Sequence, residues 1–439
     1  MLHFIFADLR RNWIGVAIVA LLVALATALG VAVTLQERAL RLGSARAAAP
    51  FDLVVGAPGS ETQLVLSSVF LQPAPLPLVP TRVLADLRAD PRVEAAVPVG
   101  FGDFVGNYPI VGTTADAIAM LGGLAEGDGF EHLGDAVAGA QVTRQVGTGF
   151  RPFHGLPGEP GEVHAEVEYR IVGRMAPTGT PWDRAILVPI QSVWEVHADH
   201  DYGPSGDAPA THAHEDDHDH AHDDRDDDGH GHGAGGHDHD HDHDSEFASR
   251  PVDEGALADP GSPGVPAIVV KPKSIADAYN LRQQYRAETT VAVFPGEVLT
   301  RLYGTLGDAR QVLSAVAAGA QSLVAAALLM VIAVHVLQRR RQIGALRAFG
   351  APRAVVLAMV WLEVFLILVA GLLAGFGIGY AAVRVLSERL GEASGVAMPV
   401  EFQPSDAWTL ALFLCVAAVV TLLPALIAYR QTPAQALRA

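Results

Sequence analysis

The sequence predicts an α-helical membrane protein with four transmembrane helices, plus an extracytoplasmic α+β domain inserted between helices 1 and 2. Half of the 439 residues are hydrophobic and the mean hydropathy is +0.28. For a chain of this length, such values indicate membrane-spanning segments. Four long apolar runs carry this character, and short strand and helix patterns fill the stretch between the first run and the second.

Each apolar run is long enough for a helix to cross a bilayer, which takes about 20 residues. The first run has no charged residue over 23 positions. A signal-peptide core is only about 7–15 residues long, so the first run is interpreted as an uncleaved anchor. The third run exceeds a simple span, and its first turns are expected at the membrane interface. The predicted transmembrane helices are residues 13–35, 312–337, 354–383 and 408–429.

Arginines set the predicted orientation. They precede the first span, cluster between the second and third spans, and follow the fourth span. The positive-inside rule therefore places these three segments in the cytoplasm. The expected location is the bacterial cytoplasmic (inner) membrane, with several passes and the large domain outside. The cytoplasmic segments are residues 1–12, 338–353 and 430–439, and the extracytoplasmic segments are residues 36–311 and 384–407.

The large extracytoplasmic segment has the patterns of a folded α+β domain with a helical stalk. Several short strands broken by glycine are expected within residues 93–111. Residues 297–311 are expected to form a helix that leads into the second span. The other predicted strands are residues 51–56, 167–172, 185–189, 265–270 and 289–294, and the other predicted helices are residues 81–88 and 274–286.

A His/Asp-rich insertion, residues 197–262, interrupts this domain. It holds 13 of the 18 histidines. Imidazole and carboxylate are ligands that Zn²⁺, Ni²⁺ and Cu²⁺ accept. The Gly/Asp/Pro-rich backbone cannot pack a core, so the insertion is expected to be disordered. No CxxC or HExxH frame is present, which favours several loose sites. The candidate metal ligands are His197, His200, His212, His214, His218, His220, His222, His230, His232, His237, His239, His241 and His243.

The same insertion dominates the charge of the chain. Residues 199–244 contain 16 acidic residues and one base, whereas the whole chain has a formal net charge of −18. The remainder is close to neutral, which excludes a nucleic-acid partner. The single cysteine, Cys415, cannot form an intrachain disulfide. No tightly bound cofactor is expected, and zinc, nickel or copper would bind only in the insertion.

Residues 338–351, QRRRQIGALRAFGA, resemble the "RR-x-I-G-x-L-R-A-x-G-A" stretch of MacB/FtsX-type ABC transporter permeases. Residues 429–438 resemble the ending of that family, and Glu363 and a glycine-rich third span follow the first motif as they do in the family. One span, a large outer domain and three further spans is also the family's layout. The resemblance covers the membrane part and extends only loosely to the outer domain. The His/Asp-rich insertion departs from the family.

The resemblance implies a permease that works as a homodimer with two ABC ATPase subunits. The chain has no P-loop motif, and its only lysines, Lys271 and Lys273, lie in the outer domain, so ATP hydrolysis is expected on the separate ATPase subunit. In such permeases the loop after the second span carries a coupling helix that docks on the ATPase. An ordinary positive-inside loop would explain the arginines here, but not the apolar spacing. The implied coupling residues are Arg339, Arg340, Arg341, Ile343, Leu346, Arg347 and Phe349.

Other polar residues give weaker indications of function. Glu363 in the third span is interpreted as a helix-packing or interface group. His154 and His164 flank a Gly/Pro turn and could join the metal-binding insertion, although ordinary surface histidines are the simpler interpretation. No nucleophile-elbow or other hydrolase pattern is present, so no catalytic residue is expected in this chain.

These observations predict a permease that transmits ATPase-driven motion to its extracytoplasmic domain and takes part in zinc or other divalent-metal handling. A periplasmic metal-binding or adaptor protein is a further possible partner, beside membrane lipid. Two alternatives stay open. One is a transmembrane regulator that activates an extracytoplasmic partner such as a cell-wall hydrolase. The other is a lipoprotein or peptide export permease whose histidine-rich insertion is incidental.

Overall fold

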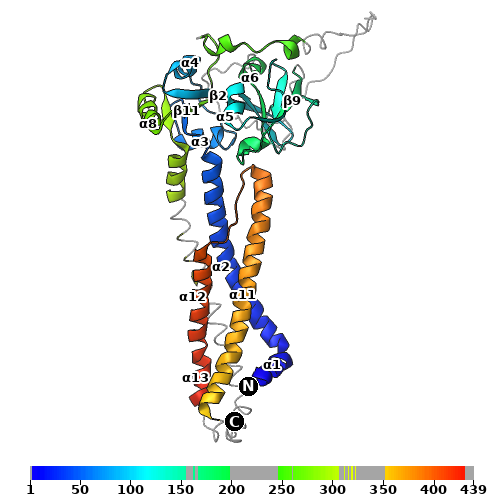
Figure 1. The fold of residues 1–439 in the computed structure, drawn as a ribbon, viewed down its shortest axis with the longest axis vertical. Coiled ribbons are helices and arrows are strands. Elements are labelled where there is room, and N and C mark those ends of the chain that lie inside the picture. Colours follow the sequence, from blue (N-terminus) through cyan, green and yellow to red (C-terminus); the bar gives the residue numbers. More distant parts are fainter. Residues whose placement is uncertain are drawn as a thin grey trace, which may run out of the picture. The chain divides into compact units, whose positions relative to one another are not determined.

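The structure is a computed structural model. It describes residues 2–154, 162–163, 167–197, 246–259, 261–305 and 352–430, with single positions between 311 and 322. The chain forms two compact units. The helical unit comprises residues 1–51, 179–181 and 293–439, and the sheet unit comprises residues 52–178 and 182–292 (Figure 1).

Long apolar helices make up the helical unit. Two of them are long and apolar enough to cross a membrane, with a mean hydropathy of 2.8 and 2.7 in their most apolar windows. Both helices continue beyond the predicted spans into the flanking charged segments. The second predicted span, residues 312–337, falls almost wholly outside the described residues, so the number of spans stays a prediction. The helices are α1 (Leu2–Arg11), α2 (Trp13–Ala48), α11 (Arg353–Ser394), α12 (Pro404–Val420) and α13 (Leu422–Arg430). Residues 295–305 are also helical.

The surface of α2 suits a lipid environment. Leu21, Leu25 and Leu29 are spaced by four residues, so they lie on one face of the helix, and each is more than half exposed. A soluble protein rarely exposes a continuous apolar face of this size. Lipid contact is the simplest account of this row of leucines.

Glycines on α11 let it approach α2 closely. Gly371, Gly375 and Gly379 recur every four residues and therefore share one face of α11. A Cβ atom on Gly375 would lie 2.4 Å from the carbonyl oxygen of Ala24, and one on Gly379 would lie 2.8 Å from that of Ala28. Such small-residue faces drive packing between helices in membranes, where apolar burial gives little advantage over lipid. The glycine-rich third span predicted from the sequence thus has a packing role against α2.

The fourth predicted span is divided between two helices. Helix α12 ends at Val420 and α13 begins at Leu422, with Thr421 between them. Pro424 lacks the backbone N–H that would bond to the carbonyl of residue 420, so a regular helix is interrupted at this point. Trp361 on α11 donates a hydrogen bond from Nε1 to the carbonyl oxygen of Ala418 at 2.9 Å, which ties α11 to α12 just before the break.

The sheet unit contains a mixed sheet of twelve strands in the order β12-β1-β11-β2-β3-β10-β5-β9-β4, with β6, β7 and β8 attached at its margins. Most neighbours are antiparallel, whereas β10 pairs with β3 and β5 pairs with β9 in parallel. The strands are β1 (Leu53–Gly56), β2 (Val93–Val105), β3 (Tyr108–Thr113), β4 (Leu124–Gly127), β5 (Asp135–Ala138), β6 (Gly149–Phe150), β7 (Phe153–His154), β8 (Glu162–Val163), β9 (Tyr169–Met175), β10 (Ile186–Pro189), β11 (Ala267–Pro272) and β12 (Val291–Val293).

Helices border the sheet. Two of them confirm helices predicted from the sequence, at residues 81–88 and 274–286. They are α3 (Glu61–Ser68), α4 (Thr81–Ala89), α5 (Ala115–Met120), α6 (Ile190–Val196) and α8 (Ile275–Gln284), with short 3₁₀ turns η1 (Pro181–Arg184) and η2 (Glu254–Leu257).

Residues 93–111 agree in part with the sequence expectation. Two strands, β2 and β3, are separated at Gly106, whose φ is +63°. Strand β2 is longer than expected, because it runs for 13 residues through Gly100. Gly100 and Gly112 lie within strands, where they leave room for a helix. A Cβ on Gly100 would lie 2.6 Å from Cδ1 of Ile190, and one on Gly112 would lie 2.5 Å from Cγ2 of Val193. Helix α6 therefore packs directly on the backbones of β2 and β3.

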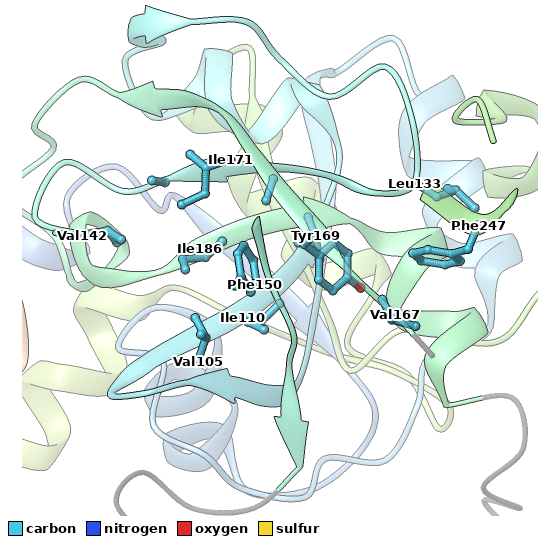
Figure 2. Close-up of a cluster of buried hydrophobic side chains, with 13 residues drawn as sticks. Val105, Ile110, Leu133, Val142, Phe150, Val167, Tyr169, Ile171, Ile186 and Phe247 are labelled. Atoms are coloured by element: carbon cyan, nitrogen blue, oxygen red, sulfur yellow. The ribbon is translucent and has the colours of Figure 1, made fainter. Parts of the chain in front are cut away.

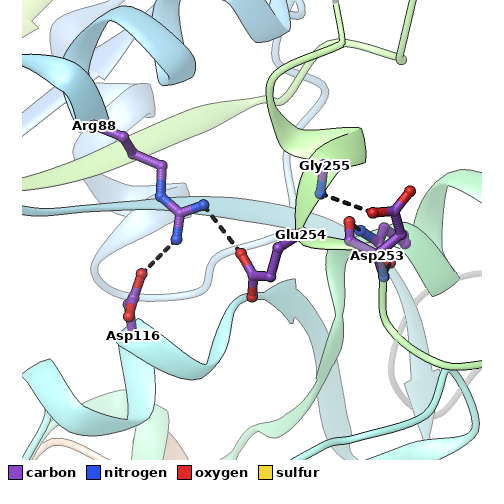
Figure 3. Close-up of polar contacts among 6 residues, drawn as sticks. Arg88, Asp116, Asp253, Glu254 and Gly255 are labelled. Carbon is purple, nitrogen blue, oxygen red and sulfur yellow. Dashed lines mark hydrogen bonds and ion pairs between the residues drawn. The ribbon is translucent and has the colours of Figure 1, made fainter.

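The end of the predicted insertion is folded rather than disordered, since residues 246–249 are helical and residues 254–257 form a 3₁₀ turn. Phe247 packs with Leu133 and Tyr169 in the buried cluster of Figure 2, and its ring lies edge-on to Tyr169 at 6.2 Å. Arg88 on α4 forms ion pairs with Asp116 on α5 and Glu254 on η2 (Figure 3). The returning chain is thus fixed by both apolar and charged contacts.

Candidate metal centre

Three potential metal ligands converge in the sheet unit: Asp103 on β2, His154 on β7 and His197 after α6. Their ligand atoms all lie within 4.8 Å of one another. Asp103 Oδ1 is 3.3 Å from Nδ1 of His154 and 3.4 Å from Nε2 of His197. We call this group the three-ligand centre.

The local fold explains how Asp103 reaches this position. Strand β2 is irregular between Phe101 and Phe104, where its pairing with β3 shifts register. Bulges of this kind redirect side chains and often lie beside functional sites. Asp103 pairs instead with His154 of β7, directly across the ladder. The carboxylate and the first imidazole are therefore set by strand register.

His197 is oriented by the end of α6. Its backbone N–H bonds to the carbonyl of Val193, and its Nδ1 lies 2.8 Å from the same oxygen. A carbonyl oxygen can only accept, so Nδ1 carries the proton and Nε2 faces Asp103. A backbone carbonyl that holds one ring nitrogen of a histidine is the usual support for a metal-binding imidazole.

Burial differs across the centre. Asp103 and His197 are 5% and 7% exposed, whereas the side chain of His154 is 54% exposed. Burial lowers the pKa of His197, but the hydrogen bond and the negative charge of Asp103 outweigh burial, and the pKa lies above its usual value. Burial also raises the pKa of the Tyr169 hydroxyl, and the charge of Asp103 adds to that effect. Two ligands are therefore enclosed and one is open to solvent.

The geometry suits a small divalent ion. In a tetrahedral site with Zn–N and Zn–O bonds of about 2.0–2.1 Å, neighbouring ligand atoms lie about 3.3 Å apart. The two distances to Asp103 match this value, and the two imidazole nitrogens lie within 4.8 Å of each other. Two imidazoles and one carboxylate leave one position of a four-coordinate ion for water or an incoming ligand.

The structure places few of the candidate residues named from sequence. His197 is the one insertion histidine within the described residues, and the other twelve fall outside them. The implied coupling residues, from Arg339 to Phe349, also lie outside the described residues. Sequence reasoning took His154 for a surface residue and did not single out Asp103. These residues are 51 positions apart, and only the pairing of β2 with β7 brings them together.

Comparisons with known proteins support the membrane part. Residues 314–434 match the model of the FtsX-like permease C-terminal family. The structure of the periplasmic region of MacB from Actinobacillus actinomycetemcomitans is similar at 9% identity over 58% of this chain and 95% of that chain, with a TM-score of 0.30. That score is too low to establish a common fold. No curated protein matches the chain.

FtsX-like permeases are inner-membrane proteins with a periplasmic domain, and they generally act as non-enzymatic components beside an ABC ATPase. The matched segment includes the arginine-rich motif, the glycine-rich helix α11 and the first part of the C-terminal motif, residues 429–434. The match therefore assigns residues 314–434 to the FtsX-like permease C-terminal family.

Proposed function

We propose that the chain is the permease subunit of an ABC system in which a homodimer works with two ATPase subunits. ATP-driven motion would pass through the coupling segment to the extracytoplasmic domain, in a role linked to zinc or other divalent-metal handling. The family match over residues 314–434 carries this proposal, because it includes the implied coupling residues and the third and fourth predicted spans.

The dimensions of the helices support transmission of motion. Helix α2 has 36 residues, which at 1.5 Å per residue gives about 54 Å. The hydrocarbon core of a bilayer is about 30 Å thick. Only residues 49–52 separate α2 from β1, and only Phe294 separates β12 from the helical residues 295–305. The two units are thus joined by short stretches of chain at both of these points.

Polar contacts brace the part of α2 that follows the predicted span. Arg38 forms a bidentate ion pair with Asp406, with Nη1–Oδ2 and Nη2–Oδ1 distances of 2.9 and 2.7 Å. The two side chains are 14% and 10% exposed. Arg–carboxylate pairs of this geometry are strong and directional. Ser44 also bonds to the Tyr303 hydroxyl at 2.5 Å. These contacts support a stalk that moves as one body.

The metal link is supported by the ligand content of the insertion and by the three-ligand centre, which includes the first histidine of the insertion, His197. Histidine and aspartate in this density bind borderline divalent ions. The metal role and the transmission role are separable, and each has its own test.

Topology gives the first test. A reporter that is active only in the cytoplasm is expected to work when fused after Arg341 or Ala439, and to fail when fused within residues 60–300. These outcomes follow from the distribution of arginines around the predicted spans. A second reporter, active only outside the cytoplasm, should give the inverse pattern. Cytoplasmic activity within residues 60–300 would overturn the four-span arrangement.

Deletion of Thr211–Asp244 tests the insertion. The full-length permease is expected to bind more than one Zn²⁺, and the deletion is expected to remove this multiple binding while metal-free thermal stability changes little. Growth of the deletion strain should be impaired only when zinc is scarce or in excess. A complete permease knockout is the control. Growth equal to wild type at every zinc level, with an impaired knockout, would favour the export alternative.

A further inference from the structure

The three-ligand centre differs in kind from the loose ligands of the insertion. Its ligands come from three separate elements, β2, β7 and the end of α6, and each element is fixed by the fold. Helix α6 packs on Gly100 and Gly112, and Ser192 donates a buried hydrogen bond to the carbonyl of Leu133 at 2.7 Å. A site held this way loses little conformational entropy when an ion binds.

A second His–Asp pair in the same unit provides a contrast. His132 Nδ1 lies 3.3 Å from Asp135 Oδ2, the same distance as in the His154–Asp103 pair. Among the described residues, no third His, Cys, Asp or Glu completes a metal-binding group with this pair. Asp135 instead accepts hydrogen bonds from the backbone N–H groups of Glu131 and His132 and so closes a local turn. Proximity of a histidine to an aspartate therefore does not by itself distinguish the three-ligand centre. The third ligand does.

We propose that Asp103, His154 and His197 form a single-ion Zn²⁺ site that shares only His197 with the insertion and is tighter than any site formed by the other insertion histidines. Asp103 Oδ1, His154 Nδ1 and His197 Nε2 supply three ligands, and the exposed side of His154 is the route by which the ion enters. The biological role of this site rests on the proposed function. The site is the place where metal would bind to the folded domain.

The three-ligand centre lies where the insertion begins in the chain. His197 is the first histidine of the insertion and is also a ligand of the centre, and His200 follows three residues later. An ion at the centre ties β7 and the end of α6 to Asp103, at the point where the insertion begins. Metal bound there stabilises the folded domain, whereas metal bound by the other insertion histidines has no such support from the described fold.

The test uses the full-length permease in detergent, stripped of metal, with Thr211–Asp244 deleted so that most insertion histidines are absent. Co²⁺ serves as the spectroscopic probe and Zn²⁺ is added in competition. We expect one ion per chain, with the visible absorption of four-coordinate Co²⁺, and a rise in thermal unfolding temperature with metal concentration. His154→Gln, His197→Gln and Asp103→Asn are each expected to weaken binding by more than about 100-fold, since loss of an outer partner alone costs 10–100-fold.

His132→Gln is the matched control and should bind as the parent does. His154→Gln keeps the test independent of folding, because that side chain is half exposed and its loss leaves the core intact. The proposal is overturned if the deletion protein binds no ion, or if His154→Gln and His197→Gln bind as tightly as the parent. If the ligand variants lose the ion but their strains grow as wild type at every zinc level, the site stands and its link to metal handling is refuted. If the deletion protein binds no ion but its strain has a zinc phenotype, the site is refuted and metal handling stands.

Discussion

Combining Arg347→Glu with Phe349→Ala is expected to abolish the permease's stimulation of its partner ATPase, so that turnover falls to that of the ATPase subunit alone. The arginine offers a charge for pairing and the phenylalanine an apolar anchor, both in the motif that resembles the family's coupling helix. Removing the anchor and reversing the charge takes one contact of each kind from the docking surface and adds a repulsive charge to it. ATP turnover of the complex reconstituted in lipid is the measurement.

Membrane insertion should be intact in the double variant, because neither residue lies in a predicted span. Arg384→Glu is the matched control. It reverses the charge of an exposed arginine on α11 that pairs with Glu388 at 3.2 Å, outside the coupling segment. Stimulation should survive in this control. If the double variant stimulates ATP turnover as the wild type does, residues 338–351 do not couple the permease to the ATPase.

Gly375→Leu is expected to disrupt the helical unit, with loss of folded permease or a large fall in its thermal unfolding temperature. The new side chain would begin 2.4 Å from the carbonyl oxygen of Ala24, and a backbone atom cannot move aside as a side-chain tip can. Overpacking costs about 1–3 kcal/mol where the surroundings relax, and more where they cannot. Thermal unfolding of the detergent-solubilised protein is the measurement.

Gly377→Leu provides a close control. It lies two residues away on the same helix, and a Cβ there meets nothing within 4 Å. Both substitutions raise intrinsic helix propensity by a similar amount, so only the packing differs. Equal behaviour of the two variants would contradict the close approach of α2 and α11.

Local patterns in the sequence account for much of the fold. Strands β1, β9, β10, β11 and β12 and helices α4 and α8 lie where alternation or apolar runs predicted them. Glycine in β2 was misleading, because its role depends on α6, which comes about 90 residues later in the chain. The glycine-rich face of α11 was visible in the sequence, but its partner α2 lies at the opposite end of the chain.

The three-ligand centre shows the limit of such reasoning. Its residues follow no metal-binding spacing, and Asp103 lies in an irregular stretch of β2 whose pairing with β7 depends on tertiary structure. The density of histidines pointed to the insertion, and His197 is the one residue that belongs both to the insertion and to the three-ligand centre. Strand register and the end of α6 determine the site, and neither can be predicted from a single sequence.

Residues 250 and 253, near the end of the insertion, are held against α6, which ends just before the insertion begins. Gln191 on α6 accepts a hydrogen bond from the backbone N–H of Asp253 at 3.0 Å, and Glu195 forms an ion pair with Arg250. For a loop closed in this way, each doubling of its length costs only about 0.6 kcal/mol of closure entropy. The number of histidines between these contacts can therefore grow or shrink over evolution at almost no expense to the domain, so related permeases could tune their capacity for metal by length alone.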